Sequence, residues 1–193
     1  MINADRMTAE QFVECRSDLP DGGRWHELHE GRPVLMEAPD DAHGTAVLNL
    51  SKALASWLQN RDERKIGYAV HQIGLLVERD PDSVFCPAMS FFDSGRPFEQ
   101  SDHAIATAPP RLVVDVASAN DRRSEMRTRT LAYAVLGVKT IWIPDPTKKE
   151  IQVIAADDHT LALASWQTLE GGAALPGFAI KVEDVFAQPE WWK

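Results

Sequence analysis

The sequence predicts an α/β fold, a single domain over residues 1–193 in which a mixed β-sheet is flanked by helices. Strands and helices follow one another in a strand–strand–helix–strand order, which is typical of one mixed sheet with helices packed on it. Residues 111–116 form an almost continuous apolar run, as in a central strand covered on both faces. A chain of 193 residues is about one domain long and can bury a core without disulfides or metals.

The N-terminal segment predicts a helix over about residues 8–18. Thr8 and Gln11 have the spacing of a capping box, in which the threonine hydroxyl accepts from the amide three residues on and the glutamine side chain reaches back. Pro20-Asp21-Gly22-Gly23 then ends the helix.

The next segment, Trp25 to Met36, predicts a β-hairpin that turns at Glu30-Gly31. Because side chains alternate along a strand, Trp25, Glu27 and His29 share one face of its first strand.

A long helix is predicted over about residues 41–60, after Pro39-Asp40-Asp41. Its apolar residues recur at intervals of three and four, and His43 lies one turn before them on the same stripe: Val47, Leu50, Leu54, Trp57 and Leu58. Two strands should follow, over about 67–78 and 84–92, and then a polar surface loop over 93–110.

The C-terminal half continues with a helix over about 122–136, whose apolar positions are Met126, Leu131, Tyr133 and Ala134 and which ends at Gly137. A strand over 139–143 is closed by Pro144-Asp145-Pro146. Residues 151–154 and 161–168 predict a hairpin at the edge of the sheet, before a short strand and Trp191-Trp192.

The charge and composition exclude several classes of protein. Twenty Lys and Arg against 29 Asp and Glu give a net charge of −9, which argues against simple coating of nucleic acid or anionic lipid. The sequence has no stretch of about 18 uncharged apolar residues that could span a membrane. It contains no GxSxG elbow, no GxxxxGK[ST] phosphate loop and no GxGxxG fingerprint.

Cys15 and Cys86 are the two cysteines, and they form no CxxC pair. We expect two buried free thiols, with a single disulfide as the alternative. No secretory signal is evident at the N-terminus, and we expect a cytoplasmic protein.

Asp115 is the most informative single residue, because it lies inside the apolar run. An ionised carboxylate there is costly unless it is paired or binds a metal; the alternative is an edge strand with Asp115 facing solvent. Glu27, taken alone, reads as a solvated strand residue and His43 as a core histidine. His26 and His29 are three residues apart and lack the HExxH spacing of a zinc site.

Basic residues gather directly after the Asp115 strand. Arg122, Arg123, Arg127, Arg129 and Lys139 stand against Glu125 alone, a local charge of +4 over residues 122–139. This segment is either a solvated helix face or a patch that contacts phosphate.

Segments spread over nearly the whole chain match a known pattern in order and spacing. They are Met7 to Phe12, His26 to Gly31, Glu37-Ala38-Pro39 with His43, Val84 to Pro87, Pro110 to Ser118, Leu131 to Ala134, Gly137-Val138, Trp142 to Pro146 and Leu175-Pro176-Gly177. With these segments the chain resembles the Uma-two family of putative restriction endonucleases, whose members look like PD-(D/E)xK phosphodiesterases. The resemblance implies a restriction-endonuclease-like fold.

The resemblance also implies a mechanism, hydrolysis of DNA phosphodiesters with magnesium or manganese. Glu27 would be an accessory acid, position 88 the first metal aspartate, position 115 the second acid and position 129 the basic residue. By this reading Glu27 and Asp115 would hold the metal, and Glu27, Asp115 and Arg129 would form the catalytic set around position 88.

The sequence departs from the family pattern at the chemical positions. Ala88 stands where the family has aspartate, Asp115 where glutamate is usual and Arg129 where lysine is usual. Alanine deletes a metal ligand, and arginine cannot exchange a proton near neutral pH. Neither Asp82 nor Asp93 is a convincing substitute for the missing ligand.

Two functions therefore remain open. One is a metal-dependent endonuclease with a degenerate site, and the other is a non-catalytic binding or oligomerisation module on the nuclease scaffold. DNA would be at most a weak partner, no membrane partner is expected, and the apolar tail favours a homodimer.

Overall fold

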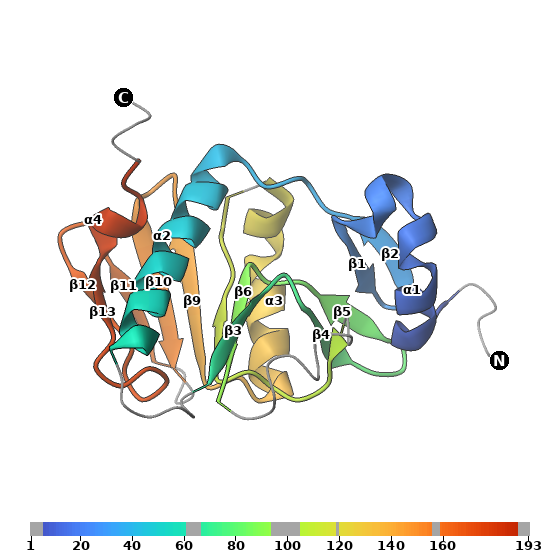
Figure 1. Ribbon diagram of the computed structural model, residues 1–193. Helices are drawn as coiled ribbons and strands as arrows, with labels where there is room; N and C mark the ends of the chain where they lie inside the picture. Colours follow the sequence, from blue (N-terminus) through green and yellow to red (C-terminus); the bar gives the residue numbers. More distant parts are fainter. Residues whose placement is uncertain (1–5, 61–66, 94–104, 119, 156–158, 189–193) are drawn as a thin grey trace.

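The chain folds into two β-sheets that lie side by side, with a small third sheet at the C-terminal end (Figure 1). A computed structural model describes residues 6–60, 67–93, 105–118, 120–155 and 159–188. The six-stranded sheet has the order β11-β10-β9-β8-β6-β3, and the five-stranded sheet the order β2-β1-β5-β4-β7. The predicted fold class holds, but the expected single mixed sheet is divided.

The six-stranded sheet contains β3 (Tyr68–His71), β6 (Met89–Phe92), β8 (Leu112–Val114), β9 (Thr140–Asp145), β10 (Glu150–Ala155) and β11 (Thr160–Leu163). The five-stranded sheet contains β1 (His26–His29), β2 (Arg32–Leu35), β4 (Gly74–Glu78), β5 (Ser83–Phe85) and β7 (Ile105–Ala106). The small sheet pairs β12 (Thr168–Glu170) with β13 (Ala179–Lys181).

The sheet divides because two predicted strands each break in the middle. The strand expected over 67–78 becomes β3 and β4, and Gln72 between them has a positive φ of 52°, which an extended strand cannot contain. The strand expected over 84–92 becomes β5 and β6, interrupted by Cys86-Pro87-Ala88, where proline has no N–H for a ladder. At each of these two breaks the chain passes from one sheet to the other.

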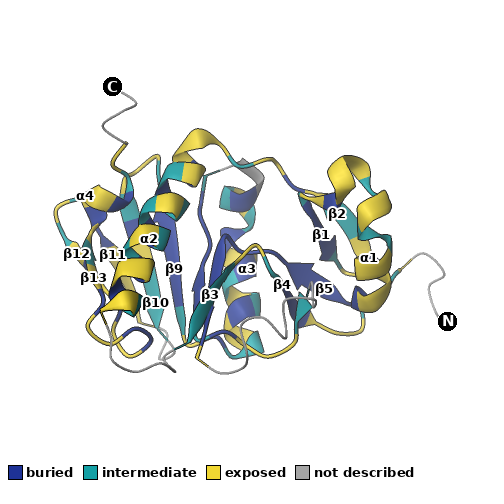
Figure 2. Cartoon of the chain, viewed as in Figure 1, coloured by how far each residue is buried: buried dark blue, intermediate teal, exposed yellow. Residues whose placement is uncertain are grey.

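The predicted central strand is confirmed as β8, which pairs antiparallel with β6 and parallel with β9. All three of its residues are buried, and the neighbouring strand β9 is largely buried as well (Figure 2). Leu112 and Val114 pack in one core with helix α2 (Asp41–Gln59), whereas Val113 packs in the other core with helix α3 (Asn120–Leu136). The two long helices therefore cover opposite faces of this sheet.

The N-terminal helix α1 (Ala9–Cys15) is shorter than predicted, but its capping box is present. A 3₁₀ stretch over Arg16–Asp18 replaces its expected last turn. A second 3₁₀ stretch follows over Pro20–Gly23. The hairpin of β1 and β2 turns at Glu30-Gly31 as predicted.

In α2, Leu50, Leu54 and Trp57 are buried as expected. In α3, Met126 and Tyr133 are buried, but Leu131 and Ala134 are exposed, so half of that predicted stripe is wrong.

The predicted edge hairpin is confirmed, with β11 at the edge of its sheet. The chain then runs through β13 into the short helix α4 (Val182–Val185), and Trp191-Trp192 lies outside the described residues. None of the described helices is long and apolar enough to cross a membrane. Both cysteines are free thiols, as predicted. Cys86 is buried as expected, but Cys15 is only half-buried.

Candidate functional site

Glu27 lies in the middle of β1, and its side chain is turned into the protein. Glu27 is 0 % exposed, so the prediction that its carboxylate is solvated is wrong. The backbone N–H of Cys86 donates to Glu27 Oε1 at 2.7 Å, and His29 Nε2 lies 3.2 Å from Oε2 on the same strand face. The crossing segment after β5 thus holds this carboxylate in place.

Asp115 follows the last residue of β8, and it is also 0 % exposed. Its N–H donates to the carbonyl of Trp142 at 3.0 Å, which extends the pairing with β9 by one residue. Its Oδ2 accepts a hydrogen bond of 2.7 Å from the Tyr133 hydroxyl. The alternative of a solvent-facing Asp115 on an edge strand is therefore wrong.

Arg129 joins the two carboxylates from the middle of α3. Its Nη1 and Nη2 donate to Glu27 Oε2 and Oε1 at 2.6 and 3.0 Å, and its Nε donates to Asp115 Oδ2 at 2.7 Å. Its guanidinium also lies over the ring of Phe85, 4.8 Å from the ring centre. Arg129 is 0 % exposed, so every polar group of this side chain is used inside the protein.

Arg122 reaches the same carboxylates from the first turn of α3. It lies seven residues, or two turns, before Arg129, and it is 5 % exposed. Its Nη1 is 3.5 Å from Asp115 Oδ1, 3.9 Å from Glu27 Oε1 and 3.5 Å from the carbonyl oxygen of Cys86. We call Glu27, Asp115, Arg122 and Arg129 the arginine–carboxylate cluster.

The cluster keeps the Glu27 carboxylate ionised. Burial alone would raise the pKa of Glu27, but the charge of Arg129, the hydrogen bonds from His29 and Arg129 and the charge of Arg122 outweigh it and lower this pKa to about 2. Tyr133 is affected in the opposite sense, because burial and the neighbouring Asp115 raise its pKa well above the usual 10. Tyr133 is therefore a neutral hydrogen-bond donor to Asp115.

The structure brings Glu27, Asp115 and Arg129 together, as the resemblance implies. Ala88 is buried two residues after Cys86, whose backbone contacts Glu27 and Arg122. Neither alternative carboxylate replaces the missing ligand. Asp82 accepts from the N–H of Ala9 at the start of α1, and Asp93 pairs with Arg111.

The sequence reading missed Arg122, Tyr133 and Cys86 as members of the site. A signal was present, since Arg122, Arg129 and Tyr133 are spaced by seven and four and so share one helical face with Met126. The Cys86 backbone contact carries no sequence signal.

The remaining histidines do not form a metal site. Among the described ranges, no three His, Cys, Asp or Glu side chains are placed to hold a metal ion. His43 is buried in α2, and its Nδ1 lies 2.8 Å from the Ser118 hydroxyl. Burial, with a smaller contribution from Arg122, lowers the pKa of His43, so it is neutral near pH 7. It fits the expected core histidine.

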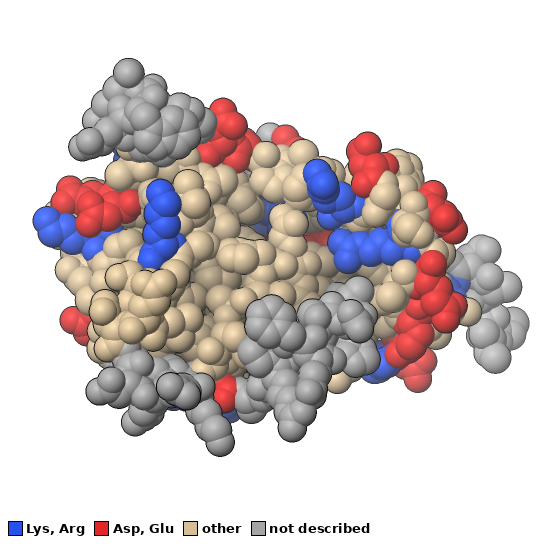
Figure 3. All heavy atoms as spheres, viewed as in Figure 1, with Lys and Arg blue, Asp and Glu red and all other residues tan. Residues whose placement is uncertain are grey.

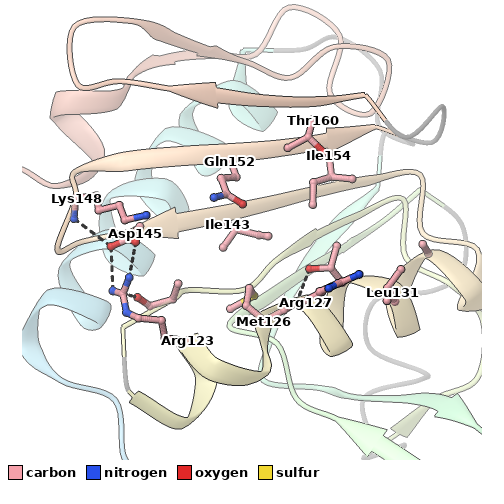
Figure 4. A pocket seen from close by; sticks show the side chains of 13 residues that line it. Arg123, Met126, Arg127, Leu131, Ile143, Asp145, Lys148, Gln152, Ile154 and Thr160 are labelled. Atoms are coloured by element: carbon pink, nitrogen blue, oxygen red, sulfur yellow. Dashed lines mark hydrogen bonds and ion pairs between the residues drawn. The ribbon is translucent and has the colours of Figure 1, made fainter.

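The predicted basic patch is largely used up inside the protein. Arg122 and Arg129 are buried, and Arg123 donates to Asp145 through Nη2 at 3.0 Å. Arg127 remains exposed at a pocket of about 460 Å³ between α3, β9 and β10, which Lys148 also lines (Figure 4). On the face in Figure 3, the described Lys and Arg side chains form no continuous patch.

The cluster does not fit the divalent metal that the family resemblance implies. Its two carboxylates and two guanidiniums are formally neutral, so a divalent ion would add two buried positive charges. The carboxylate oxygens already face guanidinium nitrogens at 2.6–3.9 Å. A metal between the carboxylates would have to displace an arginine.

One comparison with known proteins identifies the family, and another identifies the fold. The family model described as Uma2, putative restriction endonuclease, matches residues 9–183. The crystal structure of a putative nuclease belonging to DUF820 from Anabaena variabilis is similar, with a TM-score of 0.75 and 16 % identity over 93 % of this chain and 97 % of that one. No curated protein matches. The chain therefore belongs to the Uma2 family of putative restriction endonucleases.

Proposed function

We propose that this protein is a non-hydrolytic member of its family, in which the nuclease scaffold serves as a binding and oligomerisation module. One observation carries the proposal: the two carboxylates that would hold a metal are fully buried and bound by Arg129 through three hydrogen bonds. Phosphodiester hydrolysis needs a metal or a positioned cation that reaches the scissile phosphate. Arg129 is closed off from solvent and is occupied on every nitrogen.

The competing function is metal-dependent DNA hydrolysis with magnesium or manganese. It is supported by the convergence of Glu27, Asp115 and Arg129 at one place in the fold. It also requires the metal aspartate that the family has at position 88, and Ala88 supplies no ligand. Magnesium binds through few protein carboxylates, so the loss of one weakens binding severely.

Supercoiled plasmid DNA with Mg²⁺ or Mn²⁺ separates the two functions. We expect no nicking by the parent chain. Nicking that is lost in Asp115→Asn would overturn the proposal and establish the endonuclease. Ala88→Asp, with Ala88→Asn as its uncharged control, then asks whether the aspartate is the missing part. Activity in Ala88→Asp alone would show a scaffold that lacks one ligand, as proposed, whereas no activity shows that the arginines also block the site.

DNA would be a weak, electrostatic partner of this module. With the cluster arginines buried, Arg127 and Lys148 are two side chains beside α3 that could reach a phosphate. Such contacts weaken steeply with salt. We expect measurable anisotropy of a labelled duplex at about 20 mM salt and none at about 200 mM, and a loss of the low-salt signal in Arg127→Ala/Lys148→Ala.

Self-association is the second part of the proposal. Leu131 and Val135 lie one turn apart on α3 and are 59 % and 83 % exposed, and Leu131 also lines the pocket of Figure 4. Contiguous exposed apolar patches mark protein–protein interfaces, and we propose that these two side chains belong to one. Light scattering should give a dimer that Val135→Glu dissociates, whereas Leu48→Glu, at an exposed position of α2, leaves it intact. A parent monomer at all concentrations would exclude this part.

The domain boundaries and the location belong to the same proposal. We take residues 1–193 as a single restriction-endonuclease-like domain, because the two core clusters share the strands β6, β8 and β9. The cytoplasmic location predicted from the sequence stays a prediction.

A further inference from the structure

We infer that the Arg122 guanidinium takes the place of a divalent cation, and that the chain contains a latent cation site which opens when this side chain is removed. The inference rests on the proposed non-hydrolytic function, since it explains how a buried carboxylate pair persists without metal. The site would take a hard divalent ion such as Mg²⁺ or Mn²⁺.

Three oxygen atoms from three separate segments converge on one nitrogen of Arg122. Nη1 lies 3.5 Å from Asp115 Oδ1, 3.9 Å from Glu27 Oε1 and 3.5 Å from the Cys86 carbonyl oxygen. Two carboxylate oxygens and one backbone carbonyl are the ligands that hard divalent cations prefer. The nitrogen is thus surrounded as a compact cation would be.

Arg122 and Arg129 bind the same carboxylates in different ways. Arg129 grips Glu27 with two parallel hydrogen bonds of 2.6 and 3.0 Å, the fork geometry that suits a guanidinium. Arg122 instead points one nitrogen at both acids from 3.5 and 3.9 Å, beyond ordinary hydrogen-bond distance. Its contribution to the carboxylates is that of a central positive charge.

Asp115 Oδ1 is the oxygen that favours a cation position over an arginine site in which every carboxylate oxygen is hydrogen-bonded. It is a buried carboxylate oxygen that accepts no hydrogen bond from any described residue, although Oδ2 of the same carboxylate accepts two. Arg122 faces it at ion-pair distance only. A buried polar atom without a hydrogen bond calls for an explanation, and a bound cation is one that fits the charge facing this oxygen.

The charge balance makes the two cations mutually exclusive. With both arginines present, the cluster is neutral and gains nothing from a divalent ion. Without Arg122, the two carboxylates and Arg129 carry a net charge of −1, and the space beside Asp115 and Glu27 opens. A divalent ion bound there would change this charge from −1 to +1 and would fill the missing volume.

The test compares the full-length parent with Arg122→Ala, using Mn²⁺ alone as the probe. Electron paramagnetic resonance should detect no Mn²⁺ bound at the cluster in the parent up to millimolar concentration. Arg122→Ala should melt at a lower temperature than the parent and bind one Mn²⁺. At about one hundred times the dissociation constant, Mn²⁺ should raise its melting temperature by roughly 5–10 °C.

Two matched variants isolate the cation position. Arg122→Lys keeps a positive charge near the same oxygens and should bind no Mn²⁺. Arg123→Ala removes the neighbouring arginine of the same helix turn, which pairs with Asp145 outside the cluster, and should also bind none. Binding by Arg122→Ala should disappear when Asp115→Asn is added.

Each outcome decides the inference. If Arg122→Ala is unfolded without metal, refolding on addition of Mn²⁺ supports the latent site, and failure to refold overturns it. Folded Arg122→Ala that binds no Mn²⁺ also overturns it, as does a parent chain that binds Mn²⁺ in an Asp115-dependent way. None of these readouts involves DNA, so they are separate from the plasmid experiment, in which nicking by the parent overturns the proposed function itself.

Discussion

Arg129 binds Glu27 through two hydrogen bonds, Nη1 to Oε2 at 2.6 Å and Nη2 to Oε1 at 3.0 Å, although 102 positions separate the two residues in the chain. The pair ties β1 of the five-stranded sheet to α3, which covers the six-stranded sheet. Asp115 at the end of β8 completes the link through Arg129 Nε. The residues to which the family resemblance assigns catalysis therefore connect the two sheets of this protein.

Removing the Arg129 guanidinium should destabilise the protein strongly. Arg129→Met leaves Glu27 and Asp115 buried with only Arg122 to compensate them, and breaking a buried pair in this way costs about 3–5 kcal/mol. Urea denaturation measures the loss. Arg127→Ala, at an exposed position of the same helix, should change the unfolding free energy by no more than about 0.5 kcal/mol. Equal effects of the two variants would mean that the cluster does not hold the fold together.

The stability of the protein should fall at acid pH because of Glu27. Its pKa is lowered from 4.5 to about 2 in the folded chain, so the ionised form is favoured by folding. The resulting stabilisation is complete above about pH 4.5 and is lost as the pH falls towards 2. Its size is on the order of 3 kcal/mol. Glu27→Gln should be less stable near neutral pH and should lack this part of the acid dependence.

An exposed carboxylate provides the control for that titration. A hydrogen bond from Arg79 lowers the pKa of Glu10 to about 2 as well, but the Glu10 side chain is largely exposed, and solvent screens such pairs. Unfolding curves between pH 2 and 7 for Glu10→Gln should therefore follow the parent closely. If Glu10→Gln removed as much of the acid dependence as Glu27→Gln, the buried cluster would not be its source.

The Tyr133 hydroxyl should contribute measurably to the cluster. It donates to Asp115 Oδ2 at 2.7 Å inside the core, and hydrogen bonds to charged groups contribute about 1.5–3 kcal/mol. Tyr133→Phe should lower the unfolding free energy by about that amount. In an Asp115→Asn background the same substitution should cost less, because its acceptor is no longer charged. Equal costs in the two backgrounds would show that the hydroxyl acts independently of Asp115.

The two thiols should differ in reactivity. Burial, followed by the charge of Glu27, raises the pKa of Cys86 to about 12, whereas Cys15 is half-buried near the surface of α1. A chromogenic disulfide reagent at pH 8 should therefore label one thiol in the native protein and two in urea. Native labelling should vanish in Cys15→Ser. Rapid labelling of Cys86 in the folded chain would show that the segment Cys86-Pro87-Ala88 opens readily.

Much of the fold followed from local patterns, and the exceptions have physical causes. The capping box of Thr8, the hairpin turn at Glu30-Gly31 and the buried strand before Asp115 are set by neighbouring residues. The breaks at Gln72 and Cys86-Pro87-Ala88 were missed because the apolar pattern continues through them. A glutamine with positive φ carries no glycine-like signal in the sequence.

The family resemblance grouped three residues of the candidate site, but it did not indicate that they are buried and paired with one another. The family pattern placed Glu27, Asp115 and Arg129 in one site, and the structure brings them together. Arginine is rarely buried, so a helix with four arginines reads as solvent-exposed, and nothing local indicates that Arg122 and Arg129 point inward. Their burial depends on acids that are distant in sequence, which only the tertiary fold pairs with them.

The most direct test of the neutral cluster is a crystal structure of the parent chain grown with about 50 mM MnCl₂, with diffraction data collected at the manganese absorption edge. We predict no anomalous peak between Glu27 and Asp115, and Arg122 Nη1 in its place beside Asp115 Oδ1. A manganese peak within about 2.5 Å of both carboxylates, with Arg122 turned away, would contradict the neutral cluster and would support metal-dependent hydrolysis.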